Sequence, residues 1–155
     1  MRVAVGSDHA GYPMKQAVIE AITSRGHEAI DCGSDGTGPV DFPDITVATC
    51  TPVLDGVAER AILVCGTGAG AVMAANKIPG IRCGLANEPY SAHQAVEHDD
   101  ANAIAMGAWL VPQVFVAEIV TNFLGATFLD DEDVRRRVAK LNALDAPRTA
   151  ARPQS

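Results

Sequence analysis

Short apolar and β-branched runs alternate along the chain with longer segments in which apolar residues recur every three or four positions. The short runs predict β-strands at Arg2–Gly6, His27–Cys32, Ala61–Cys65, Ile81–Ala86 and Asn102–Met106. Ala61–Cys65 is apolar throughout, which is typical of a strand that is buried on both faces of a parallel sheet. The alternation predicts an α/β fold in which helices cover both faces of a five-stranded parallel sheet.

The longer segments predict helices between these strands. Pro13 fits the first turn of the first helix, and Gly26 is expected to end it in a left-handed conformation. Pro52 is expected to kink or shorten the next helix, because proline lacks a backbone N–H. A long exposed loop is expected at Gly33–Pro43. The helices after it are expected at Asp44–Val57, Pro89–His98, Pro112–Leu124 and Asp130–Leu144, and a further helix is expected to follow Gly70 and to end at about Lys77.

Length and composition narrow the class of protein. The 155 residues fit one domain, expected at residues 1–144, with 145–155 as a loose tail. The formal net charge of −7 disfavours nucleic acid and anionic membranes as partners. The chain has no apolar stretch of membrane-spanning length and no signal-peptide pattern, so a cytoplasmic location is expected. The cysteines form no Cys-x-x-Cys pair and are predicted to be free thiols.

Polar residues next to the strands are the first candidates for a site, because open parallel sheets bind ligands beyond the carboxyl ends of their strands. Ser7-Asp8-His9 follows the first strand, and Cys65-Gly66-Thr67-Gly68-Ala69-Gly70 follows the central strand. Glu97-His98-Asp99-Asp100 stands just before the last strand. These three segments therefore contain the candidate catalytic and ligand-binding residues.

The glycine-rich turn Gly66–Gly70 can bind an anion, because its amides open the next helix and point outward. Gly66-x-Gly68-x-x-Ala71 also satisfies a loose dinucleotide-binding pattern, with Glu88 where a ribose-binding acid could stand. A nucleotide-dependent dehydrogenase needs a further substrate domain, for which this chain has no room. A Walker phosphate loop is excluded, because no Gly-Lys-Ser/Thr follows the glycines.

Cys65 begins this turn, where the N-terminus of the next helix would favour its thiolate and make it a base or a nucleophile. A buried structural cysteine is the alternative. Thr67 could relay a proton or could satisfy its own turn. The residue types alone leave both pairs of alternatives open.

Asp8 and His9 set a carboxylate beside an imidazole, a pair that can transfer protons and hold an anion. Alternatively, Asp8 caps the turn that follows it. His98 is another candidate acid or base, although histidines near helix ends often only complement the helix dipole. His93 and His98 are five residues apart and fall on different helix faces, so no metal site is predicted.

Several longer motifs occur in a distinctive order: Gly6-Ser7-Asp8-His9-Ala10-Gly11, Asp41-Phe42-Pro43, Cys65-Gly66-Thr67-Gly68, Ala74-Ala75-Asn76-Lys77, Gly80-Ile81-Arg82, Glu88-Pro89-Tyr90-Ser91-Ala92, and Glu97-His98 with Asn102. In these motifs the chain resembles the ribose-5-phosphate isomerase B / galactose-6-phosphate isomerase family, from Arg2 to about Leu144. The resemblance implies a Rossmann-like three-layer αβα sandwich that forms a homodimer or homotetramer with shared active sites. It also implies interconversion of aldose and ketose sugar phosphates without a metal or cofactor.

The resemblance further implies residue roles. Cys65 would be the base, Thr67 would help to move the proton, and the turn would hold the enediolate through Gly66, Gly68, Ala69 and Gly70. His98 with Asp8 would open the sugar ring, and His9 would meet the phosphate. A second branch of the family has a glutamate where this chain has Ala71, so the chain is similar to the cysteine branch.

Three positions depart from the family pattern. Trp109 stands where the family has a phosphate-binding arginine, and Asp99 replaces an asparagine. In the last helix Arg137 matches the second of two arginines, but the first falls on Asp133. Each change removes positive charge or a neutral donor, or adds negative charge, where a phosphate would be expected. An unphosphorylated or atypical sugar is therefore an alternative to a small sugar phosphate.

Two roles stay open for the residues near these departures. Arg135 or Arg136 could replace the missing cation, or could only complement the helix dipole. Trp109 could stack on the apolar face of a sugar, or could line a subunit contact. The preferred function is a cofactor-independent aldose–ketose isomerase with Cys65 as base. The alternative is a non-isomerase relative that binds a nucleotide or sugar-like ligand in the glycine-rich turn.

Overall fold

The computed structural model describes residues 1–146, and its strands form one five-stranded parallel sheet. The strand order is β2-β1-β3-β5-β4, so β3 is central. The predicted parallel α/β fold is thereby confirmed. The strands are β1 (Arg2–Ser7), β2 (Glu28–Asp31), β3 (Arg60–Cys65), β4 (Cys83–Leu85) and β5 (Ala103–Gly107).

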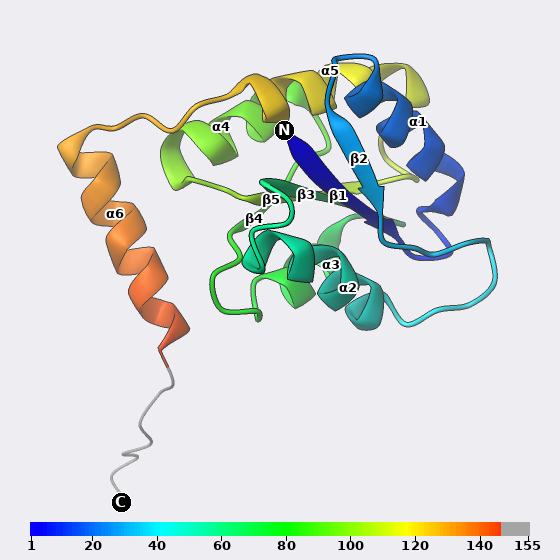
Figure 1. Ribbon diagram of the computed structural model, residues 1–155, viewed down its shortest axis with the longest axis horizontal. Helices are drawn as coiled ribbons and strands as arrows, with labels where there is room; N and C mark the ends of the chain where they lie inside the picture. Colours follow the sequence, from blue (N-terminus) through cyan, green and yellow to red (C-terminus); the bar gives the residue numbers. More distant parts are fainter. Residues whose placement is uncertain (147–155) are drawn as a thin grey trace, which may run out of the picture.

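Helices on both faces of the sheet make the fold a three-layer αβα sandwich (Figure 1). One face is covered by α1 (Tyr12–Thr23), α4 (Pro89–Asp99) and α5 (Gln113–Gly125), and the other by α2 (Phe42–Leu54) and α3 (Ala69–Ala75). A last helix, α6 (Glu132–Asn142), lies at the side of the sandwich and leads into the 3₁₀ helix η1 (Ala143–Asp145).

Two cores result because successive strand residues point to opposite faces of the sheet. Val3 and Val5 of β1 belong to the core under α1, α4 and α5, whereas Ala4 belongs to the core under α2 and α3. In β3, Leu63 and Cys65 face the side of α2 and α3. The side chain of Cys65 therefore lies on the same side of the sheet as the helix that follows it.

Two elements differ from their predicted bounds for identifiable reasons. Helix α2 begins at Phe42, because Asp41 is the N-cap residue in extended conformation and a proline occupies the first turn. Pro52 lies in its last turn, and the helix ends at Leu54, which is the predicted shortening. Strand β4 begins later than predicted, at Cys83, because the side-chain oxygen of Asn102 accepts the N–H of Arg82.

Three further predictions concern the helices, the thiols and the C-terminal residues. Among residues 1–146, no helix combines the length and the apolar character needed to cross a membrane. All four cysteines are free thiols, as predicted. Asp145 ends η1, and its carboxylate accepts the N–H of Gly80 at 2.8 Å. The rest of the predicted tail, residues 147–155, lies outside the described residues.

Candidate active site

The turn after β1 lies directly on the carboxyl end of β3. Chain connections leave β1 and β3 toward opposite edges of the sheet, which is where open parallel sheets form a binding crevice. Ser7 is paired with Val64, and the Asp8 N–H donates to the Val64 carbonyl at 3.1 Å. A Cβ on Gly11 would overlap that carbonyl and would lie 2.9 Å from the nitrogen of Cys65. Only glycine therefore lets the turn approach Cys65 this closely.

The sulfur of Cys65 faces the glycine-rich turn. Cys65 is 6% exposed, and its Sγ accepts the N–H of Gly68 at 3.0 Å. Gly68 has φ +85°, and a Cβ there would lie 2.5 Å from a methyl carbon of Leu85. A hydrogen bond from a backbone amide stabilises a thiolate more than a neutral thiol. The sulfur of Cys65 thus has a backbone donor of the glycine-rich turn within hydrogen-bond distance.

The other thiols have different surroundings. Burial raises the pKa of Cys50 to about 12, and burial also raises the pKa of Cys32 and Cys83. Cys83 and Cys32 direct their S–H groups toward backbone carbonyls. These three cysteines are therefore structural.

Donors remain free around the sulfur. Within residues 1–146, the backbone N–H groups of Gly66, Thr67 and Gly70 have no acceptor. The exposed hydroxyl of Thr67 accepts the N–H of Ala69 at 3.4 Å, so it satisfies its own turn but still has its proton to donate. The sequence placed all of these residues in one turn, and the structure brings them together beside Cys65.

Asp8 and His9 lie at the same edge. The Oδ1 atom of Asp8 accepts the N–H of Gly11 at 2.8 Å, which caps the turn that follows β1. His9 is exposed, and its Nδ1 accepts the N–H of Val40 at 3.4 Å. His9 thereby connects the β1 turn to the long loop before α2.

Two aromatic rings flank the glycine-rich turn. A Cβ on Gly66 would lie 2.8–2.9 Å from three atoms of the Trp109 ring, and a Cβ on Gly70 would lie 3.3 Å from the ring of Phe42. Trp109 was a predicted site residue, whereas Phe42 was noticed only as part of a motif. The contact with Phe42 was missed because it depends on how α2 packs against α3.

Asn87 is a second residue that the sequence did not single out. Its Oδ1 accepts the N–H of Gly107 at 2.8 Å, and its Nδ2 donates to the Thr67 carbonyl at 3.5 Å. Asn87 therefore fixes the ends of β4 and β5 against the glycine-rich turn. A single asparagine after a strand gives no sequence signal for this role.

The predicted residues His98, Asp99 and Arg137 lie away from Cys65 in one chain. Helix α4 starts at the carboxyl end of β4 and returns to the amino end of β5, so its eleven residues carry His98 about 16 Å toward the opposite edge. Arg137 is exposed on α6, which packs beside the C-terminal end of α4. One chain thus separates the predicted groups into two clusters.

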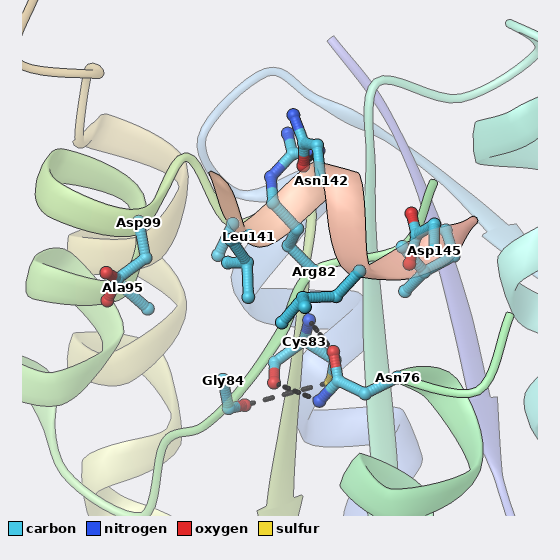
Figure 2. Close-up of a pocket in the computed structure, with 12 residues that line it drawn as sticks. Asn76, Arg82, Cys83, Gly84, Ala95, Asp99, Leu141, Asn142 and Asp145 are labelled. Atoms are coloured by element: carbon cyan, nitrogen blue, oxygen red, sulfur yellow. Dashed lines mark hydrogen bonds between the residues drawn. The ribbon is translucent and has the colours of Figure 1, made fainter. Parts of the chain in front are cut away.

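A cavity of about 400 Å³ lies at that opposite edge (Figure 2). Asp99 of α4, Arg82 before β4 and Asn142 of α6 contribute to its wall, and the Arg82 guanidinium reaches toward the Asn142 side chain. A second cavity of about 320 Å³ lies beside Lys15 and Asp31. Neither of these two cavities includes the glycine-rich turn.

Glu88 has a structural role. Its carboxylate accepts the N–H groups of Tyr90 and Ser91 at 2.7 and 2.6 Å, which caps α4. The hydrogen bonds with Ser91 lower the pKa of Glu88. A carboxylate committed to a helix cap is not available to bind a ribose. Within residues 1–146, no group of three or more His, Cys, Asp or Glu side chains is arranged to hold a metal.

The fold and this site define an α/β protein of the Rossmann-like class, with a thiol, a hydroxyl and free amides at the carboxyl edge of a parallel sheet. The chain belongs to the Ribose/Galactose Isomerase family, whose model matches residues 3–141. It is an aldose–ketose isomerase, which confirms the predicted enzyme class.

Relatives are similar over nearly the whole chain. Ribose-5-phosphate isomerase B of Escherichia coli is 34% identical over 95% of this chain and 98% of the relative. The 4-deoxy-4-sulfo-D-erythrose isomerase of a Clostridium species is 32% identical over 90% of this chain and 89% of the relative. The structure of Clostridium thermocellum ribose-5-phosphate isomerase B has a TM-score of 0.90 and 37% identity, covering 94% of this chain and 97% of that one.

Proposed function

We propose that the enzyme interconverts an aldose and its ketose through an enediolate, with Cys65 as the base. The Cys65 thiolate removes the proton from the carbon next to the carbonyl. The electron pair of that C–H bond forms a C=C bond, and the π pair of the carbonyl moves onto its oxygen to give the enediolate. The Cys65 thiol then returns the proton to the former carbonyl carbon. Thr67 moves the remaining proton between the two oxygens, so atoms and charge balance without an external reactant.

The observation that carries this proposal is the bond from the Gly68 amide to Cys65 Sγ, beside unpaired amides of the same turn. The amides of Gly66, Thr67 and Gly70 can donate to the enediolate where its charge develops. Ala69 continues the same turn. A buried structural cysteine needs none of these features.

A second copy of the chain completes this active site. His98, which would open the ring together with Asp8, lies near the amino edge of the sheet, far from Cys65 of its own chain. Asp99 and Arg137 lie with it. A homodimer or homotetramer that shares sites between subunits brings one subunit's His98 to its partner's Cys65. The length of α4, which keeps His98 away from Cys65 within one chain, supports this arrangement.

The substrate is a small sugar phosphate or an unphosphorylated or atypical sugar. Relatives include one named for ribose 5-phosphate and one named for a sulfo-sugar, so the end group varies within the family. His9 and Arg137 are the groups that would meet a phosphate. The alternative of a nucleotide-binding relative is less well supported, because Glu88 caps α4. The cytoplasmic location and the absence of a cofactor stay predictions.

Deuterium exchange tests the role of Cys65. The wild-type enzyme, Cys65→Ser and the matched control Cys32→Ser are incubated with tetroses, pentoses and their phosphates in deuterated water. Label should appear beside the carbonyl with the wild type and with the Cys32 variant. Cys65→Ser should exchange about 10²–10⁴ times more slowly, the usual contribution of a general base. Wild-type exchange by a folded Cys65→Ser enzyme would exclude Cys65 as the base.

A further inference from the structure

The loops beyond the carboxyl ends of the five strands carry no lysine or arginine. They comprise residues 8–11, 32–41, 66–68, 86–88 and 108–112, and their carboxylates are Asp8, Asp35, Asp41 and Glu88. The end of the molecule that holds Cys65 is therefore acidic. A dianionic substrate would meet net repulsion from this chain.

The two nearby groups able to carry positive charge are already engaged. Lys15 is buried, and its Nζ donates to Asp31 Oδ1 at 2.8 Å and to the Ser34 carbonyl at 2.6 Å. The Nδ1 atom of His9 accepts the N–H of Val40 at 3.4 Å. Lys15 therefore offers no free cation to a ligand over the glycine-rich turn.

Trp109 lies beside the glycine-rich turn. Its backbone N–H donates to the Gly66 carbonyl at 3.0 Å, and the backbone N–H of Ala108 donates to the Cys65 carbonyl at 2.8 Å. Its ring lies on Gly66, yet Trp109 is 73% exposed. The backbone thus holds a large indole against the catalytic turn, with most of its surface open.

We propose that Trp109 is the specificity-determining residue, and that it selects sugars whose end remote from the carbonyl is uncharged. The inference rests on the proposed isomerase function. An indole offers an apolar face and one N–H donor, which suit the C–H groups and hydroxyls of a sugar. A phosphate against this ring would lose water without gaining a cation from the carboxyl-edge loops of the same chain. The substrate class is therefore an unphosphorylated aldose–ketose pair.

Intrinsic fluorescence tests binding independently of catalysis, because Trp109 is the single tryptophan of the chain. The Cys65→Ser enzyme is titrated with D-erythrose, D-ribose and D-allose and with the corresponding terminal phosphates. A saturable change with a neutral sugar, at lower concentration than with its phosphate, is expected. Tighter binding of the phosphates would overturn the inference.

Kinetics test selectivity. For each sugar and its phosphate, kcat/KM is measured with the wild type, Trp109→Arg and Trp109→Phe, and with Leu110→Arg as a matched control. Leu110 is the exposed neighbour, so this control adds the same charge one residue away. The ratio of neutral to phosphorylated substrate should fall at least about tenfold in Trp109→Arg, mainly through KM. It should stay within about threefold in Trp109→Phe and Leu110→Arg.

The outcomes separate the two proposals. Trp109→Arg could turn over substrate with the same ratio of neutral to phosphorylated kcat/KM as the wild type. That result overturns the inference and leaves the isomerase function standing. A wild-type preference for phosphates that Arg137→Ala abolishes also overturns it, because a partner subunit then supplies the cation. Selective fluorescence changes without any deuterium exchange in wild-type enzyme would support the role of Trp109 in binding and refute the proposed chemistry.

Discussion

Gly11 packs against the end of β3 with no room for a side chain, so Gly11→Ala should weaken both the fold and the active site. Its φ of −83° is open to every residue, so the cost is steric and not conformational. A methyl group at this position would overlap the Val64 carbonyl and approach the Cys65 nitrogen. Because those atoms belong to the central strand, the turn that carries Asp8 must move away.

The magnitude follows from what this movement breaks. Overpacking of a tight contact costs about 1–3 kcal/mol. Displacing the turn also weakens the Asp8 N–H bond to Val64 and the Gly11 N–H bond to Asp8, each worth about 0.5–1.5 kcal/mol. Together these terms predict a loss of about 2–6 kcal/mol from the free energy of unfolding.

Urea denaturation measures this loss, and Gly125→Ala is the matched control. Gly125 ends α5, and a Cβ there has no atom within 4 Å. The control should be unchanged or gain about 0.4–1 kcal/mol, because alanine restricts the unfolded chain. The Gly11 variant should unfold at least about 1 M earlier. Equal midpoints for the two variants would refute the steric argument.

Two further variants test other contacts by urea denaturation. Glu88→Gln should cost about 1 kcal/mol at pH 7. The folded state lowers the pKa of Glu88, so this contribution exists above the unfolded pKa and fades as pH falls through the folded value. A difference from wild type that is equally large at pH 3 would contradict the capping argument. Lys15→Met should cost about 1–3 kcal/mol, because the buried Ser34 carbonyl loses its donor; an unchanged midpoint would show that this bond adds nothing.

The layers of the fold were predictable because each strand carries its own signal. Ala61–Cys65 is apolar throughout, and such a run in a chain of this pattern has to be buried on both faces. The start of β4 was less predictable, because the side-chain oxygen of Asn102 accepts the N–H of Arg82 there. Periodicity indicates burial but does not indicate which acceptor a backbone N–H finds.

The glycine-rich turn was also predictable, because its residues are consecutive in the chain. Cys65, Thr67 and their glycines follow one strand, so their proximity is fixed by the chain itself. The contact of Trp109 with Gly66 was not predictable in this way. It depends on β5 lying beside β3, whereas sequence order alone would allow β4 in that position.

The same connectivity explains why a single chain does not hold the whole predicted site. In a parallel sheet every connecting helix must return from the carboxyl edge to the amino edge, so the two ends of α4 lie about 16 Å apart. Residues that begin a helix after a strand lie at the edge of the sheet that holds Cys65. Residues that end such a helix, such as His98, lie at the opposite edge. Specificity that a single chain supplies must therefore come from the loops at the carboxyl edge. In this chain those loops offer an indole and carboxylates, so the end of the substrate that lies against them should be neutral.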